Sequence, residues 1–175
     1  MKASVSQQEL AHGLSTVSRA VSPRSSLAVL ANILIATDEG RLRLSATNLE
    51  LGISCWISAK IEQEGAITVP ARTISDLVGT LPNDKVDLLL NDKTQTLTVK
   101  CGSNVTDIKG IDAQEYPPMP IPELSEGVVL NVSTFKEMIQ QVAFAASSDE
   151  ARPVLQGVLT QIDGSNITMA ATDGF

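Results

Sequence analysis

The chain has 175 residues, 43% hydrophobic and 19% charged, which is enough for one large or two small domains with a buried core. A net charge of −7 and an aromatic content of 3% argue against tight gripping of nucleic acid and against base stacking, although a few cations on one face could still contact phosphates. The apolar runs are too short to span a membrane, no signal peptide is visible, and Cys55 and Cys101 lack metal-ligand spacing. We therefore expect a cytoplasmic protein with reduced thiols.

An amphipathic helix is expected near the start of the sequence. Ser6 and Glu9 have the spacing of a capping box, in which the serine hydroxyl accepts a hydrogen bond from the Glu9 amide. The apolar stripe that follows at helical spacing consists of Leu10, Leu14, Val17 and Val21. Serines and a proline after this stripe predict the end of the helix.

Strands are predicted over residues 27–37 and 41–61, with a turn at the Asp-Glu-Gly sequence between them. In the second segment the apolar residues occupy even positions up to Ala46 and odd positions from Leu49 onward. A change of parity within one strand requires an extra residue, so a β-bulge or sharp bend is predicted near Thr47 and Asn48.

A second, shorter helix is predicted from about Arg72 to the proline at position 82. Its inward-facing residues are expected to be Ile74, Leu77, Val78 and Leu81. A hairpin over residues 86–101 and an edge strand over residues 104–111 follow. The next stretch is rich in proline and acidic residues, which is typical of a boundary, so we expect a first domain over 1–118 and a linker over 119–127.

The sequence contains an internal repeat. Residues 4–50 align with residues 129–175 at a constant offset of 125 without a gap. The second copy keeps the order of periodicities, with Asn131 at the cap position and a helical stripe of Phe135, Ile139, Val142 and Ala146 before its strands. We predict a duplicated α-β-β-α-β-β unit of about 115 residues, of which the second copy, over 128–175, is incomplete.

Residue patterns typical of catalysis are missing from the sequence. There is no glycine-rich phosphate loop, nucleophile elbow or His/Cys metal cluster, so no cofactor and no enzymatic activity are expected. His12 is expected at the surface, and Asp38 and Asp163 occupy turn positions where aspartate commonly bonds the backbone.

Four cations are predicted on or beside the helices: Arg19, Arg24, Arg72 and Lys136. One interpretation is an ordinary solvated helix face. The other is a sparse basic lining on an acidic body, which would contact phosphates without reading bases.

The first copy contains the loop SPRSSLAVLANILI and the stretches TNLEL, VPAR and EYPPMP, and the second contains ARPVLQGVL followed by AATDGF. Together these motifs resemble the bacterial DNA sliding clamp family, the beta subunits of DNA polymerase III. The resemblance implies an α+β DNA-clamp fold, with helices on one face of curved antiparallel sheets. It also implies a non-catalytic processivity factor, a homodimer that encircles double-stranded DNA. Such a ring tethers the DNA polymerase III alpha subunit and the clamp loader through clamp-binding peptides, with no membrane partner.

The resemblance also implies roles for single residues. DNA contacts would come from Arg24 and Arg72. The pocket for partner peptides would use Arg152, Leu155, Thr172, Gly174 and Phe175. The dimer interface would use Thr73, Leu77, Leu81, Thr106 and Ile108. Asp149 aligns with a polar DNA contact of some relatives, but a carboxylate would repel phosphate, so no such role is expected for it.

A second interpretation of the whole chain remains open, namely a duplicated scaffold that binds proteins and never engages DNA. The resemblance places Phe175 inside the pocket motif and implies a third domain after it. We therefore expect that these 175 residues alone do not close a ring.

Overall fold

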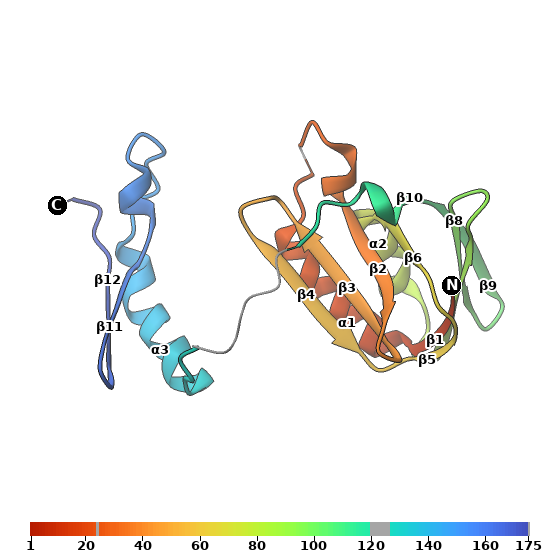
Figure 1. Ribbon diagram of the computed structural model, residues 1–175, viewed down its shortest axis with the longest axis horizontal. Helices are drawn as coiled ribbons and strands as arrows, with labels where there is room; N and C mark the ends of the chain where they lie inside the picture. The colour runs from red at the N-terminus through yellow and green to blue at the C-terminus, as the bar shows by residue number, and fades with distance from the viewer. Residues whose placement is uncertain (24, 120–126, 175) are drawn as a thin grey trace. The chain divides into compact units, whose positions relative to one another are not determined.

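The computed structural model describes residues 1–23, 25–119 and 127–174, which fall into two units, Met1–Pro120 and Ile121–Phe175 (Figure 1). The helices of the first unit are α1 (Gln7–Val17) and α2 (Ala71–Thr80). Its strands are β1 (Lys2–Ser6), β2 (Asn32–Asp38), β3 (Arg41–Thr47), β4 (Gly52–Ile57), β5 (Lys60–Gln63), β6 (Ala66–Pro70), β7 (Lys85–Asn91), β8 (Thr96–Cys101), β9 (Asn104–Lys109) and β10 (Ile111–Asp112).

The strands of the first unit form two antiparallel sheets of five strands, in the orders β5-β1-β7-β8-β9 and β10-β6-β2-β3-β4. Helix α1 packs against α2 and against β3 and β4, and α2 also contacts β6. Side chains of both helices and both sheets share one core, whose fully buried members include Leu10, Leu14, Ile33, Ile74, Leu88 and Leu97. This arrangement confirms the predicted α+β class with antiparallel sheets.

Helix α1 begins as the sequence predicts, since the Ser6 hydroxyl accepts a hydrogen bond from the Glu9 amide at 3.2 Å. The helix lies very close to the sheet beneath it at Gly13. A Cβ atom at this position would lie 2.6 Å from Cδ1 of Leu44, which is shorter than real carbon contacts. Glycine therefore permits the close approach of α1 to β3.

The single strand predicted over residues 41–61 is wrong, because β3 and β4 form a hairpin. The Asn48 amide donates to the Leu51 carbonyl at 3.1 Å, and Leu49 has a φ of +76° in this tight turn. The register pairs even with odd positions, as in Leu44 with Cys55, so the apolar residues of both strands face the core. Leu49 and Leu51 belong to the turn and are exposed. Of the two predicted alternatives near Thr47 and Asn48, the sharp bend is therefore correct, as a full chain reversal, and the β-bulge is wrong.

Three strands, β1, β6 and β10, are additions to the predicted order. The edge strand predicted over 104–111 ends at Lys109, and β10 pairs with β6 in the other sheet. Strand β5 follows β4 in the chain but pairs with β1 in the first sheet. The α2 helix, the β7–β8 hairpin and the edge position of β9 agree with the prediction. The predicted α-β-β-α-β-β order is therefore correct for the helices and hairpins but omits the strands that join them into sheets.

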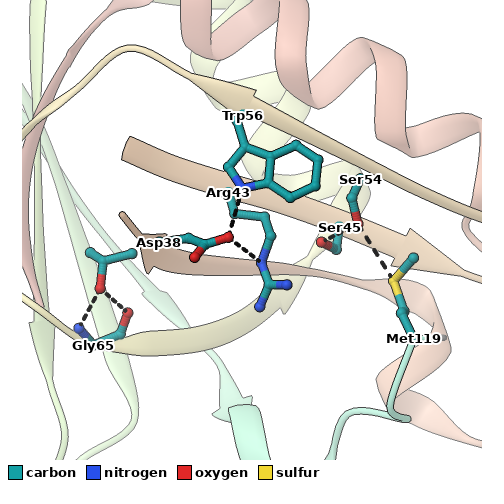
Figure 2. Close-up of polar contacts among 8 residues, drawn as sticks. Asp38, Arg43, Ser45, Ser54, Trp56, Gly65 and Met119 are labelled. Carbon is teal, nitrogen blue, oxygen red and sulfur yellow. Dashed lines mark hydrogen bonds and ion pairs between the residues drawn. The ribbon is translucent and has the colours of Figure 1, made fainter. Parts of the chain in front are cut away.

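The face of β3 and β4 that points away from the core carries a polar cluster, shown in Figure 2. The Trp56 indole N–H donates to Asp38 Oδ2 at 2.7 Å, and Nε of Arg43 lies 3.8 Å from the same oxygen. Farther along this face, the Ser45 and Ser54 hydroxyls lie 2.8 Å apart, within hydrogen-bond distance.

The second unit contains α3 (Val132–Val142), β11 (Leu159–Asp163) and β12 (Asn166–Ala170). Asn131 caps α3 by accepting from the Thr134 amide at 3.1 Å, as predicted. The bounds of α3 equal those of α1 at an offset of 125. The β11–β12 hairpin closes at the pair Asp163 and Asn166, which matches the closing pair of β2 and β3 at the same offset. The predicted repeat is therefore present in the structure.

Burial differs sharply between the copies. No residue described in 127–174 is buried, and the apolar side chains left exposed there include Val129, Val132, Phe144, Val154 and Leu159. The second unit thus repeats the local structure of the first without its core.

Candidate functional site

The predicted pocket residues of the second unit lie together. Arg152 precedes a short 3₁₀ turn (Pro153–Gln156) that contains Leu155, while Gly174 follows β12. A Cβ atom built on Gly174 would lie 3.1 Å from Nη1 of Arg152 and 3.5 Å from Cδ1 of Leu155. The predicted set also includes Thr172, in the segment after β12, and Phe175, which lies outside the described residues.

An apolar groove of about 380 Å³ adjoins these residues. It is lined by Val154, Leu155, Gly157, Leu159, Ala170, Ala171 and Thr172. Two predicted residues, Leu155 and Thr172, belong to the groove. Val154 and Leu159 also line the groove but are not among the predicted pocket residues. The signal in the sequence is a pair of apolar residues before and after Gly157 in ARPVLQGVL.

The turn after β12 fixes one end of the groove. The Thr172 hydroxyl accepts a hydrogen bond from the Gly174 amide at 3.0 Å, and Gly174 has a φ of +94°. In the first unit, the Thr47 hydroxyl accepts from the Leu49 amide at 3.0 Å in the equivalent turn. A left-handed backbone conformation strains Leu49 but not a glycine. Gly174 is therefore better suited to this turn than its counterpart Leu49.

Arg152 is held by an ion pair, because its Nε donates to Asp149 Oδ2 at 3.0 Å. The other Asp149 oxygen accepts from the Ala151 amide at 3.0 Å. Both oxygens are therefore engaged within the loop.

The cations predicted to meet DNA are exposed where the structure describes them. The Arg72 side chain is 94% exposed, and its Nε lies 3.5 Å from Asp76 Oδ2 one turn along α2. Such an exposed pair contributes little stability, so the guanidinium can turn to another anion at small cost. Arg19 and Lys136 are also exposed, and Arg24 lies outside the described residues.

The predicted interface residues divide into two kinds. Thr73 on α2 and Thr106 on β9 are exposed, and Leu77 and Leu81 are half-buried against the core. Ile108 is only 4% exposed and belongs to the core, so its side chain supports β9 from inside and presents no surface. The exposed part of this region is the outer edge of β9 together with one side of α2.

Metal-binding side chains, thiols and membrane-spanning helices were also sought in the part of the chain that the structure describes. No group of three or more His, Cys, Asp or Glu side chains there could hold a metal ion. His12 is exposed, Cys55 and Cys101 are free thiols, and burial raises the pKa of the Cys55 thiol. No helix among the described residues is long and apolar enough to cross a membrane.

Two sequence-family descriptions match the chain. Residues 1–120 match the DNA polymerase III beta subunit, N-terminal domain, and residues 129–175 match the DNA polymerase III beta subunit, central domain. The chain is 41% identical to a beta sliding clamp of Synechococcus elongatus over 99% of its own length and 47% of that protein. It is 35% identical to a beta sliding clamp of Streptomyces coelicolor, over 100% of the chain and 46% of the relative.

Solved structures agree with this assignment. A DNA polymerase III beta subunit of Eubacterium rectale, described as putative, matches with a TM-score of 0.94 at 29% identity, over 99% of this chain and 47% of that one. A sliding clamp of Bartonella birtlesii bound to griselimycin matches with a TM-score of 0.92 at 27% identity, over 99% of this chain and 47% of that one. The chain therefore spans about half the length of the relatives it matches. It belongs to the family of bacterial DNA polymerase III beta subunits, the beta sliding clamps.

Proposed function

We propose that the chain supplies the first domain and part of the second of a clamp that encircles double-stranded DNA. In this role it is a non-catalytic processivity factor in the bacterial cytoplasm. It tethers the DNA polymerase III alpha subunit and the clamp loader, and the ring forms from two copies of the full-length protein.

The observation that carries this proposal is the repeat with matching element bounds in a chain of this family. A ring built from repeated units holds DNA by enclosure, so it does not need the high phosphate affinity that a net charge of −7 opposes. The exposed cation of α2 and those on the other helices suffice for loose, sequence-independent contacts.

We further propose the domain limits 1–118 and 128–175, with a linker over 119–127 that lies mostly outside the described residues. DNA contacts are assigned to Arg24 and Arg72. The partner-peptide pocket comprises Arg152, Leu155, Thr172, Gly174 and Phe175, of which the described four lie around one apolar groove. The dimer interface comprises Thr73, Leu77, Leu81 and Thr106 on α2 and β9, with Ile108 supporting β9 from the core.

A loading assay on nicked circular DNA tests the proposal, using the complete gene product together with its clamp loader. Loaded protein should stay on the circle and be lost when the DNA is cut to a linear form, because enclosure and not affinity retains it. Equal retention on linear DNA would contradict enclosure. Failure to load at all would favour the protein-binding scaffold.

Charge reversal at the proposed contacts sharpens the assay. Arg24→Glu and Arg72→Glu should each lower loading several-fold, since each replaces an attraction for phosphate by a repulsion. Arg41→Glu is the matched control, because Arg41 is exposed on the sheet face that points away from the helices. An equal loss in all three variants would assign the effect to net charge alone and would overturn the two proposed contacts.

A further inference from the structure

Lysines gather on the outward face of the first unit's sheet of order β5-β1-β7-β8-β9. Four residues in register form one row across β5, β1, β7 and β8, namely Lys60, Ser4, Asp87 and Lys100. Residues paired in this way point to the same side of an antiparallel sheet. The chain neighbours Ala3 and Leu88 point the other way, into the core, so the row faces away from the core.

A hollow of about 350 Å³ lies beside this row. Its lining includes three lysines, two carboxylates and one large apolar side chain, namely Lys2, Lys85, Lys100, Glu62, Asp87 and Leu89. Leu89 is half-buried and pairs in register with Lys2, so it offers an apolar contact among the cations. The name lysine face is used below for Lys2, Lys60, Lys85 and Lys100 together with Leu89.

Glu62 lies between two lysines of this face. Its Oε2 is 2.6 Å from Nζ of Lys2, and its Oε1 is 3.9 Å from Nζ of Lys60. The hydrogen bond and the charge of Lys2, and more weakly the charge of Lys60, lower the pKa of the Glu62 carboxyl. One carboxylate is therefore shared by two cations.

Asp87 is shared in the same way. Its Oδ1 accepts a hydrogen bond from the Ser4 hydroxyl at 2.6 Å and lies 3.1 Å from Nζ of Lys85. Lys100 is opposite Asp87 in the β7–β8 ladder, and its ammonium group forms no ion pair with the described residues. Two carboxylates thus stand among four lysines, which leaves positive charge in excess on one face of a chain with a net charge of −7.

The ion pairs of the lysine face leave its cations available to another anion. The side chains of Lys2, Lys60 and Lys85 are 52%, 78% and 65% exposed. Exposed pairs of this kind contribute little stability, so each lysine can turn to a second carboxylate at small cost.

We propose that the lysine face binds an acidic segment of a partner protein, in which aspartate or glutamate residues flank an apolar side chain. A carboxylate of the segment lies among Lys2, Lys85 and Lys100, and the apolar side chain packs on Leu89. This surface is a docking site in addition to the peptide pocket and the DNA contacts of the proposed function, and it depends on neither.

The carboxylates of the lysine face favour a peptide over a nucleic acid. A phosphate backbone carries a charge at every nucleotide, so phosphates that cross this face would approach Glu62 and Asp87 and be repelled. A peptide carries separate charges that can be placed between these two side chains. Strands β1, β5, β7 and β8, which the structure describes throughout, also contain no aromatic ring for base stacking.

The probe is a fluorescein-labelled peptide of sequence EELEELEE, titrated with the whole 175-residue chain. Fluorescence anisotropy should show saturable binding that weakens several-fold when the ionic strength rises from about 0.05 to about 0.2 M, because salt screens exposed charges. In amide NMR, the signals of Leu89 and Lys100 should move with the bound fraction. Absence of saturation at millimolar protein, or signals that move only at Thr172 in the groove of the second unit, overturns the proposal.

Matched charge reversals locate the site. Lys100→Glu should weaken binding about tenfold, since it replaces an attraction for carboxylates by a repulsion. Lys93→Glu is the control, because it makes the same change of charge at an exposed turn between β7 and β8, outside the hollow. Lys100→Gln removes the charge without placing a second carboxylate beside Asp87, so it should keep the fold intact and weaken binding about threefold. A loss in Lys93→Glu as large as in the Lys100 variants overturns the proposal.

Changes in the ligand test its chemistry. The peptide EESEESEE should bind about fivefold more weakly, because it loses the apolar contact with Leu89. Affinity equal to that of EELEELEE overturns the proposal. Oligothymidylate of equal charge should displace the labelled peptide less well than unlabelled EELEELEE does, and better displacement would show that the face takes phosphate and would overturn the proposal. The DNA-loading assay contains no acidic peptide, so a failure there is distinguishable from a failure here.

Discussion

Helices α1 and α3 have the same length, equivalent caps and equivalent positions in the repeat, yet their environments are opposite. Leu14 on α1 is 1% exposed, whereas Ile139, its counterpart on α3, is 37% exposed. In the first unit, α2 and a second sheet close over the helix and complete the core. The comparison shows that caps and turns specify local structure, while burial depends on elements distant in sequence.

The largest expected effect concerns these two positions. Leu14→Ala should destabilise the first unit by about 3 kcal/mol, because it leaves a cavity in a closed core. Ile139→Ala should cost less than about 1 kcal/mol in the second unit, where water already reaches the site. Urea unfolding followed by fluorescence of Trp56, the one tryptophan of the sequence, reports the first unit. A shift of that transition by Ile139→Ala as large as that by Leu14→Ala would refute the contrast.

The next effect concerns Tyr116, whose phenolic oxygen accepts a hydrogen bond from the Thr47 amide at 3.0 Å in the first unit. Tyr116→Phe should destabilise the first unit by about 1–2 kcal/mol, because it leaves the buried Thr47 amide without its acceptor. Hydrogen exchange at Thr47 should accelerate, while exchange at Thr172 should stay unchanged. The control is Tyr116→Leu, which also removes the oxygen but changes the packing, so Thr47 exchange should accelerate in both variants. Unaltered exchange in Tyr116→Phe would show that the hydrogen bond contributes nothing.

The caps should give smaller and more similar effects. Ser6→Ala and Asn131→Ala should each cost about 1 kcal/mol, since each removes one acceptor at a helix start. Only Ser6→Ala should move the Trp56 transition, whereas Asn131→Ala should increase hydrogen exchange in the first turn of α3. An effect of Asn131→Ala on the Trp56 transition would mean that the units unfold together.

The smallest effect depends on pH and belongs to a sheet for which the described second unit has no counterpart. The Ser4 hydroxyl, 2.6 Å from Asp87 Oδ1, holds the pKa of Asp87 below its ordinary value, with help from Lys85 and Lys100. A lowered pKa in the folded state stabilises the protein above the ordinary aspartate pKa. This contribution is lost as pH falls below about 4.

Ser4→Ala should therefore raise the Asp87 pKa in an NMR titration and weaken the loss of stability between about pH 6 and pH 3. Ser103→Ala, at an exposed turn of the same unit, is the control and should leave both unchanged. An Asp87 pKa that does not move in Ser4→Ala would assign the shift to the lysines.

Sequence reasoning succeeded where one short segment holds the whole signal. The spacing of Ser6 and Glu9, and the helical stripes, located both helices of the repeat because caps and periodicity are local. At the β3–β4 turn the sequence located the irregularity but did not show that the chain reverses there, since a tight reversal and a bulge both change the parity of the apolar positions. The turn was hard to predict because its left-handed position is occupied by Leu49. Glycine usually occupies such a position, as Gly174 does in the other copy.

The candidate site was predicted in part for the same reason. Motifs placed Arg152, Leu155 and Gly174 in one pocket, and the structure brings them together. The contact of Tyr116 with Thr47 joins residues 69 positions apart, and the periodicity of neither segment predicts it.

Gly13 limits how far the two copies can be exchanged. Its counterpart on α3 is Met138, which lines a cavity of about 220 Å³ beside Phe135 and Ile167. A methionine at position 13 would overlap Leu44, so α3 grafted in place of α1 could not settle at the same distance from β3. The duplicated helices have therefore diverged into parts that fit only their own sheets, and a hybrid clamp must exchange a helix together with the strands it covers.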